Sequence, residues 1–218
     1  MTSLLLASAS PARLTTLGRV GIDALVQVSG VDEDAVLAAA TQRFGVLAPV
    51  DAVLLLAQAK AQAVVDRLET LDVPEDVLVL GCDSLLDLDG IALGKPRDAE
   101  DAVARWRQMR GRSGVLHTGH WLVDARPVVA EGGAGTGGTL GTTSSTTVHF
   151  GDLSDGEIDA YVATGEPLAV AGAFTVDGLG GAFIEGIEGD HHGVVGLSLP
   201  VLRALLGEIG LTVPDLWR

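Results

Sequence analysis

The apolar residues of this chain fall into two kinds of run. Short continuous runs, at Ser3–Ala7 and Val77–Cys82, predict strands that are buried on both faces. A longer stretch, from about Asp51 to Leu71, repeats its apolar residues every three to four positions and predicts a helix. Pro74 then breaks the pattern before the second strand.

Helix-start and turn signals divide the rest of the chain. Ser10 before Pro11 is a helix start, because serine accepts a free backbone N–H and proline fits the first turn. Asp89-Gly90 is a two-residue hairpin signal. From such signals we predict further helices over residues 11–18 or 11–21, 98–111, 154–165 and 198–210, and further strands over residues 91–93, 117–123 and 146–150.

Strands that alternate with helices predict a mixed α/β fold. The length of 218 residues suits one domain over residues 1–218. Residues 130–147 are rich in Gly, Thr and Ser, so we expect a flexible surface loop there between two strands.

Composition excludes several classes of partner. Lys and Arg number 14 against 29 Asp and Glu, which gives a formal charge of −15. Nucleic acid and anionic membranes both require basic surface, so we expect neither as a partner. An anionic substrate would need a local cationic pocket or a metal ion.

Two features bear on the compartment. The single cysteine, Cys82, cannot form an intrachain disulfide and suits a reducing environment. The N-terminal apolar run is short and lacks a basic leader, and no stretch approaches the roughly 18 apolar residues of a membrane span. We therefore expect a cytoplasmic protein.

The first candidate site lies at the N-terminal turn. Ser8 and Ser10 carry hydroxyls at the point where a strand gives way to a helix, and the free N–H groups of a helix start favour anions. Arg13, one turn further, can add a charged contact to a phosphate. An ordinary capped helix with a solvated arginine is the alternative.

Acidic and basic residues further along the chain are further candidates. The run Asp32-Glu33-Asp34 can hold a hard divalent cation, although a solvated acidic turn would look the same. Asp83 follows a run that predicts core, so it needs a partner, a backbone cap or a metal. Lys60 lies on the apolar stripe of its helix and either extends to solvent, or reaches an anionic ligand or one of these acidic residues. Lys95 follows in Gly94-Lys95-Pro96.

Other motifs are weaker. Residues 133–138 match G-x-G-x-x-G, but the Thr- and Ser-rich sequence that follows does not predict the helix that a dinucleotide site needs. His117 and His120, and the pair His191-His192, lack the further ligands of a zinc site. We interpret Cys82 as a small buried apolar residue, not as a nucleophile.

An ordered set of short motifs spans the whole chain: Leu6-Ala7-Ser8-Ala9-Ser10-Pro11-Ala12-Arg13, Val31-Asp32-Glu33, Ala57-Gln58-Ala59-Lys60-Ala61, Gly81-Cys82-Asp83-Ser84, Gly94-Lys95-Pro96-Arg97, Thr118-Gly119-His120, Tyr161–Pro167, Ala171–Gly181 and Val194–Pro200. Taken in this order, these motifs resemble those of the Maf family of nucleoside triphosphate pyrophosphatases, in a variant typical of actinobacteria.

The resemblance implies a fold and an activity. The fold would be an elongated, twisted mixed sheet flanked by helices, with two lobes around a nucleotide-binding cleft. The activity would be metal-dependent hydrolysis of nucleoside triphosphates, including non-standard or modified ones, to the monophosphate and pyrophosphate. Mg²⁺ or Mn²⁺ is the implied cofactor, and a homodimer is compatible with the family.

The resemblance also assigns roles to residues. Asp83 corresponds to the proposed proton acceptor, and Glu33 to an acidic residue that supports catalysis with the metal. By the same correspondence, active-site and phosphate contacts fall to Lys60 and Lys95, and to Ser8 and Arg13. Ser10 is a further candidate for substrate binding from its place in the turn.

Three positions depart from the commonest family pattern. Ala12 stands where many members carry a second arginine, Ser84 where they carry threonine, and Asp177 where they carry glutamine. These positions are linked with selection of the base, so the preferred nucleotide stays open. A regulator of cell division that binds nucleotide without turnover is the alternative function.

Overall fold

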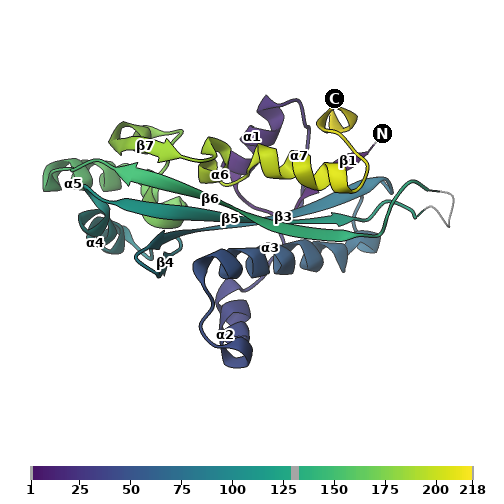
Figure 1. Cartoon of the computed structure of the whole chain (residues 1–218), viewed down its shortest axis with the longest axis horizontal. Coiled ribbons are helices and arrows are strands. Elements are labelled where there is room, and N and C mark those ends of the chain that lie inside the picture. Colours follow the sequence, from purple (N-terminus) through teal and green to yellow (C-terminus); the bar gives the residue numbers. More distant parts are fainter. Residues whose placement is uncertain (1, 129–132, 218) are drawn as a thin grey trace.

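A computed structural model describes residues 2–128 and 133–217 of the chain. Its centre is a mixed sheet in the order β2-β1-β3-β5-β6-β7, with β4 paired to β3 (Figure 1). Strand β1 pairs in parallel with β2 and β3, and the other pairs are antiparallel. The strands are β1 Ser3–Leu6, β2 Leu25–Val26, β3 Val77–Leu88, β4 Ile91–Leu93, β5 Ser113–Asp124, β6 Thr139–Phe150 and β7 Ile184–Glu188.

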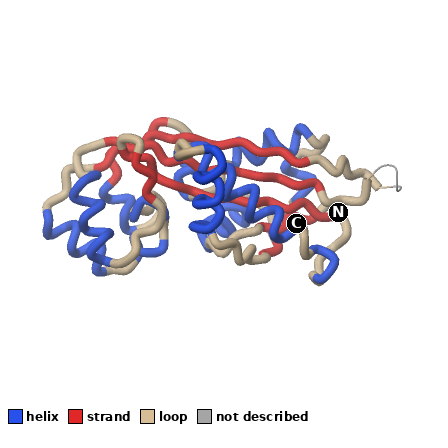
Figure 2. The backbone as a smooth tube through the Cα atoms, turned by 90° about the horizontal axis from the view of Figure 1, so that it is seen from below, coloured by secondary structure: helices blue, strands red, loops and turns tan. Residues whose placement is uncertain are grey.

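Helices cover both faces of this sheet. The α-helices are α1 Pro11–Arg19, α2 Glu33–Phe44, α3 Pro49–Val65, α4 Ala99–Met109, α5 Asp155–Ala163, α6 His191–Val195 and α7 Leu199–Glu208. Short 3-10 helices are η1 Leu68–Thr70, η3 Glu166–Ala169, η4 Ala171–Ala173, η5 Leu179–Phe183 and η6 Val213–Leu216. The molecule is elongated, and the long strands run along it (Figure 2).

Strand β1 shows why the sheet needs a helix layer on each face. Leu4 and Leu6 belong to one buried cluster with residues of α1 and α7, whereas Leu5 joins another with residues of α3. Successive side chains of a strand point to opposite faces, so a strand of only apolar residues is covered twice. Figure 1 shows α3 on one face and α1, α6 and α7 on the other.

A third cluster lies at the opposite end of the long strands. Trp106 of α4 is fully buried there and makes edge-to-face contacts with Phe150 and Tyr161, while its indole N–H donates to the carbonyl of Ala173. Most of the few aromatic residues of the chain therefore pack in this one hydrophobic cluster. Strands β3, β5 and β6 run through both ends of the molecule.

Two glycines allow α3 to lie directly on the sheet. A Cβ on Gly81 would overlap the carbonyl oxygen of Ala57, and one on Gly119 would overlap that of Val53. Both glycines face α3 from neighbouring strands. The absence of a side chain at these two points brings the helix close enough for Lys60 to reach the sheet.

Several boundaries agree with the sequence, and others required correction. The N-caps at Ser10 and Asp98, the capping box at Ser154 and the turn at Asp89 are confirmed. The helix predicted over residues 51–71 ends at Val65 and is followed by η1. Its last predicted turn is a separate 3-10 turn.

The strand that carries Asp83 is longer than predicted. It continues to Leu88, so Asp83 lies in its middle and not at its end. The prediction was wrong because a carboxylate was taken as a stop signal, whereas the ion pair with Lys60 accommodates this one inside the sheet. The acidic run at residues 32–34 begins a helix, because Asp32 caps α2 and the next two residues form its first turn.

The prediction of a flexible loop over residues 130–147 was largely wrong. Residues 129–132 lie outside the described part of the chain, but residues 139–147 belong to β6 and pair with β5. Threonine is β-branched and suits a strand, which outweighs the linker-like composition. The same finding confirms that residues 133–138 are not followed by a helix.

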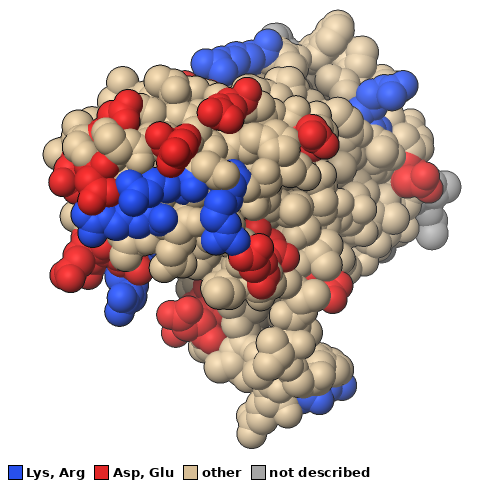
Figure 3. All heavy atoms as spheres, turned by 60° about the vertical axis from the view of Figure 1, so that its left-hand side comes forward, with Lys and Arg blue, Asp and Glu red and all other residues tan. Residues whose placement is uncertain are grey.

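Charged residues at the end formed by α4 and α5 adjoin one another. Figure 3 shows basic and acidic side chains side by side on this surface. Arg105 pairs with Asp101, Arg110 pairs with Asp155, and Arg112 pairs with Asp89. None of the helices in the described part of the chain is long and apolar enough to cross a membrane.

Candidate active site

A cavity of about 460 Å³ opens beside the middle of the sheet. Its walls come from the turn after β1, the segment before α2, α3, β3 and the segment around η4. The ten residues proposed from the sequence all line it: Ser8, Ser10, Ala12, Arg13, Glu33, Lys60, Asp83, Ser84, Lys95 and Asp177. Residues up to 169 positions apart in the chain thus meet in one place, from Ser8 to Asp177.

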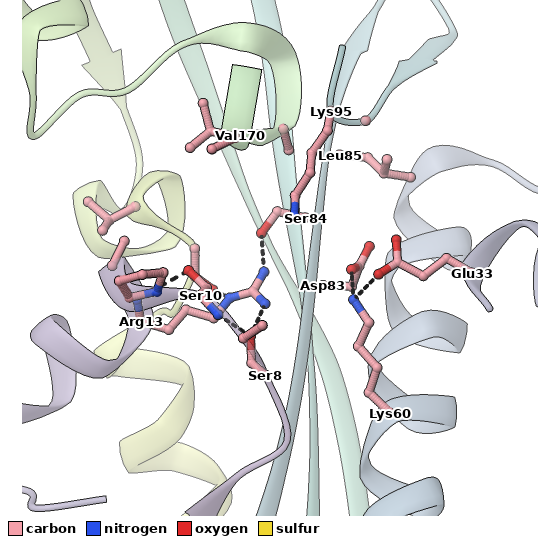
Figure 4. A pocket seen from close by; sticks show the side chains of 18 of the residues that line it. Ser8, Ser10, Arg13, Glu33, Lys60, Asp83, Ser84, Leu85, Lys95 and Val170 are labelled. Carbon is pink, nitrogen blue, oxygen red and sulfur yellow. Dashed lines mark hydrogen bonds and ion pairs between the residues drawn. The ribbon is translucent and has the colours of Figure 1, made fainter. Parts of the chain in front are cut away.

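At the centre of the cavity wall, Lys60 bridges two carboxylates (Figure 4). Its Nζ lies 2.7 Å from Oε1 of Glu33 and also contacts Oδ1 of Asp83. Lys60 is only 8% exposed and Asp83 6%, whereas half of the Glu33 side chain is open to solvent. Lys60 therefore does not extend to solvent but pairs with two acidic side chains.

The environment of Asp83 favours a proton acceptor. Burial raises the pKa of Asp83 above its ordinary value, and the charges of Lys60 and Arg13 oppose that rise. A carboxylate at the surface is a weak base, and one whose pKa is raised accepts a proton more readily. Lys60 keeps the group charged in a buried position where an isolated carboxylate would be costly.

Arg13 is buried and makes four hydrogen bonds within the protein. Its Nε donates to Gly196 O at 2.7 Å, and Nη1 donates to Ser8 Oγ at 2.9 Å and to Cys82 O at 2.8 Å. Its Nη2 donates to Ser84 Oγ at 3.1 Å. A guanidinium has five N–H groups, so four of them hold the site together. Direct contact with a phosphate stays a prediction for the remaining donor.

The two serines of the N-terminal turn have different partners. Ser8 Oγ accepts from Ser10 N at 3.2 Å as well as from Arg13, and this fixes the turn. Ser10 Oγ accepts from Arg13 N at 3.5 Å and caps α1. The helix start faces the cavity, as expected for an anion site.

Ser84 links the N-terminal turn to the second half of the chain. It accepts from Arg13 and shares a hydrogen bond of 2.8 Å with Thr118, whose hydroxyl donates to Gly193 O. The hydroxyl of Ser84 thus links two segments of the cavity wall by hydrogen bonds.

Lys95 and Asp177 enter the cavity from different segments. Both are exposed at its rim, Lys95 from the loop after β4 and Asp177 from the loop before η5. Figure 4 shows the Lys95 side chain extending toward Ser84. Ala12 also lines the cavity but offers no polar group beyond its backbone.

The structure adds lining residues that the sequence did not single out. Val28, Ser29 and Gly30 border the cavity before α2, and Val170 and Phe174 form an apolar part of the opposite wall. No local signal marks the first group. Of the second group, only Phe174 lies in a segment that carries the family resemblance, Ala171–Gly181, and that resemblance was its only sequence signal.

Burial bears on two weaker candidates, Cys82 as a nucleophile and His120 as a zinc ligand. Cys82 is fully buried, and this raises the pKa of its thiol to about 11, which confirms an apolar role. Burial, and then Arg13, lower the pKa of His120 to about 4, and its Nε2 accepts from Ser198 N at 2.8 Å. Within residues 2–128 and 133–217, no three His, Cys, Asp or Glu side chains gather as a metal site.

The fold and the cavity together define an α/β protein with a charged cleft at the centre of a mixed sheet. The chain belongs to the family described as "Maf-like protein", whose profile matches residues 3–209. This agrees with the resemblance drawn from the motifs.

Similar proteins cover nearly the whole chain. A protein of Salinispora tropica is 54% identical over 98% of this chain and 87% of its own length. One from Nocardia farcinica is 52% identical over 100% and 98%, and one from Streptomyces avermitilis is 50% identical over 98% and 94%. All three are named "Nucleoside triphosphate pyrophosphatase".

Proposed function

We propose that this protein hydrolyses nucleoside triphosphates to nucleoside monophosphates and pyrophosphate. The observation that carries the proposal is the contact of Lys60 with both Asp83 and Glu33, inside a cavity that also holds an anion-favouring helix start. The names of the relatives support the same activity.

Asp83 is the general base in this proposal. Lys60 engages its Oδ1, which leaves Oδ2 to take a proton from water. The water oxygen forms a bond to the α-phosphorus, and the bond from that phosphorus to the α–β bridging oxygen breaks. The electron pair leaves with pyrophosphate, and the proton passes to Asp83.

Cationic and N–H groups on the cavity wall would hold the phosphates. Lys95 at the rim, the free Nη2 donor of Arg13 and the start of α1 all offer positive charge or N–H donors. Donors fixed in advance stabilise the charge that develops on the leaving pyrophosphate. They also offset the repulsion between an acidic protein and its substrate.

The donor set at Glu33 and Asp83 fits a divalent metal that arrives with the nucleotide. Magnesium is commonly held by one or two carboxylates together with substrate phosphates and water. These two carboxylates supply that number, and Glu33 is open to solvent. When bound, Mg²⁺ or Mn²⁺ would neutralise phosphate charge and polarise the phosphoryl oxygens.

Val170, Phe174 and Asp177 line the same cavity and would contact the base of the nucleotide. A carboxylate at residue 177 can accept from the amino and imino groups of a base, including a modified one. Non-standard nucleotides are therefore included among the proposed substrates.

A panel of standard and modified nucleoside triphosphates, with Mg²⁺ or Mn²⁺, tests the proposal. We expect equimolar pyrophosphate and monophosphate from at least one of them, loss of activity in excess EDTA and recovery on adding metal. Full activity in EDTA would contradict the role of the metal. Nucleotide binding without pyrophosphate from any member of the panel would instead favour a regulator that does not turn over its ligand.

A further inference from the structure

The carboxylate of Glu166, in η3, accepts hydrogen bonds from Tyr161 and from one loop. Its Oε1 accepts from Tyr161 OH at 3.0 Å, from the hydroxyl of Thr175 and from Gly180 N at 2.9 Å. Its Oε2 accepts from Leu179 N at 2.9 Å. Three of these four donors belong to the loop over residues 175–180. Tyr161 OH also accepts from Thr175 N at 3.2 Å.

The loop is shaped to close around this carboxylate. A Cβ on Gly178 would come within 2.6 Å of Glu166 Oε2, and one on Gly180 would overlap the hydroxyl of Tyr161. Real Cβ atoms do not approach other atoms so closely. A side chain at either position would therefore have to displace the Glu166 carboxylate or the Tyr161 hydroxyl.

The same loop forms one wall of the active-site cavity. Thr175, Val176 and Asp177 line the cavity, whereas Glu166 is not among the lining residues of the described chain. The residues proposed for the chemistry line the same cavity from other elements, Asp83 from β3 and Lys60 from α3. Glu166 thus supports a part of the cavity wall that is separate in the chain from the elements of the proposed chemistry.

The carboxylate is charged at neutral pH. Burial would raise the pKa of Glu166, but the hydrogen bonds from Thr175, Leu179, Gly180 and Tyr161 outweigh it, and the pKa lies below the ordinary value. An ionised carboxylate accepts from all four donors, whereas an amide in its place has one accepting oxygen and an NH₂ that would face another donor.

We propose that Glu166 is a positioning residue that fixes the cavity wall over residues 175–177 against the base and sugar of the bound nucleotide. This rests on the proposed function for the identity of the ligand. Because the wall contacts the substrate in the ground state and the transition state alike, loosening it weakens binding and leaves the chemical step largely intact.

The test compares Glu166→Gln with the wild-type protein in steady-state turnover. We expect KM for the best nucleoside triphosphate to rise about tenfold, with kcat within about threefold. Discrimination among bases, measured as ratios of kcat/KM, should narrow. Tyr161→Phe removes one donor to the carboxylate and should act in the same direction with a smaller effect, which covers the case that Glu166→Gln folds poorly.

The matched control is Glu157→Gln. Glu157 is also a hydrogen-bonded glutamate, in the capping box of α5, and it does not line the cavity. It should leave KM and base discrimination unchanged. Hydrogen exchange provides a second measurement, since the amides of Leu179 and Gly180 should lose protection in Glu166→Gln and keep it in Glu157→Gln.

Binding of α,β-methylene nucleoside triphosphates separates this proposal from the proposed function. These analogues cannot be cleaved at the α–β bond, so their Kd reports on the wall whether or not the protein is a pyrophosphatase. A Kd about tenfold weaker in Glu166→Gln supports the proposal even if no turnover is found. An unchanged Kd and KM, with protection lost at Leu179 and Gly180, would show a purely structural role and overturn it, as would a wild-type protein that binds none of the analogues.

Discussion

At the scale of single residues, the central feature is a buried lysine between two carboxylates. Lys60 offsets the cost of burying Asp83, while burial still raises the pKa of that carboxyl. The sequence indicated that Lys60 needs a partner, because it lies on an apolar helix stripe. It could not say which partner, because Glu33 and Asp83 come from separate elements.

Asp83→Asn should abolish turnover without unfolding the protein. Asparagine keeps the size of the side chain but cannot accept a proton at neutral pH, and loss of a general base typically costs about 10²- to 10⁴-fold in rate. Pyrophosphate release measures the effect, and circular dichroism checks the fold. Asp87→Asn, on the same strand, is the control and should retain activity. Comparable turnover in Asp83→Asn and wild type would remove Asp83 from the role of base.

Lys60→Met should shift the pH profile of kcat/KM. The charge of Lys60 lowers the pKa of Asp83, so its removal raises that pKa further. The base acts in its deprotonated form, and the acid limb should therefore move to higher pH, together with a lower maximum rate. An acid limb at the wild-type position would show that Lys60 does not tune the base.

At the scale of elements, close packing between α3 and the sheet sets the geometry of the site. The helix and its apolar stripe were predictable, because 17 residues with a clear period leave little ambiguity. The lengths of β3 and β6 were not. A carboxylate in mid-strand and a run of Thr, Ser and Gly both resemble strand ends locally, and only pairing with β5 makes them strand interior.

Gly119→Ala tests the packing of α3. The added methyl would overlap the carbonyl of Val53, so the helix must move away from the sheet. We expect a loss of about 1–3 kcal/mol in the free energy of unfolding by urea, and reduced turnover as Lys60 moves. Gly156→Ala, in α5 with open space around it, is the control and should be neutral or slightly stabilising. Wild-type stability in Gly119→Ala would contradict this packing.

At the scale of the whole molecule, the fold brings two halves of the chain to one cavity. The start of α7 is held to the sheet by His120, which accepts from Ser198 N and is fully buried. The mixed α/β class followed from the alternation of elements. The cavity did not, since no local pattern in residues 28–30 or 169–177 marks them as neighbours of Ser8. Only the family motif over Ala171–Gly181 gave a signal for part of the second segment.

The buried His120 predicts a pH dependence of stability. Its pKa falls to about 4 in the folded protein because of burial and Arg13, against an ordinary value of 6.5. As pH falls from 6.5 toward 4, only the unfolded chain takes up this proton, so stability should decrease by up to about 3 kcal/mol from this group. Urea unfolding at pH 7 and pH 5 measures it.

His120→Gln should remove that part of the pH dependence, because glutamine does not titrate in this range. His191→Gln, at an exposed position of α6, should keep the wild-type slope. Equal slopes in all three proteins would show that His120 does not remain neutral in the fold.

The most direct test of the proposed reaction is hydrolysis in water enriched in ¹⁸O, with the products separated and weighed by mass spectrometry. Attack of water on the α-phosphorus predicts one ¹⁸O atom in the nucleoside monophosphate and none in the pyrophosphate. Label in the pyrophosphate would contradict the account. So would release of orthophosphate and a nucleoside diphosphate in place of these products.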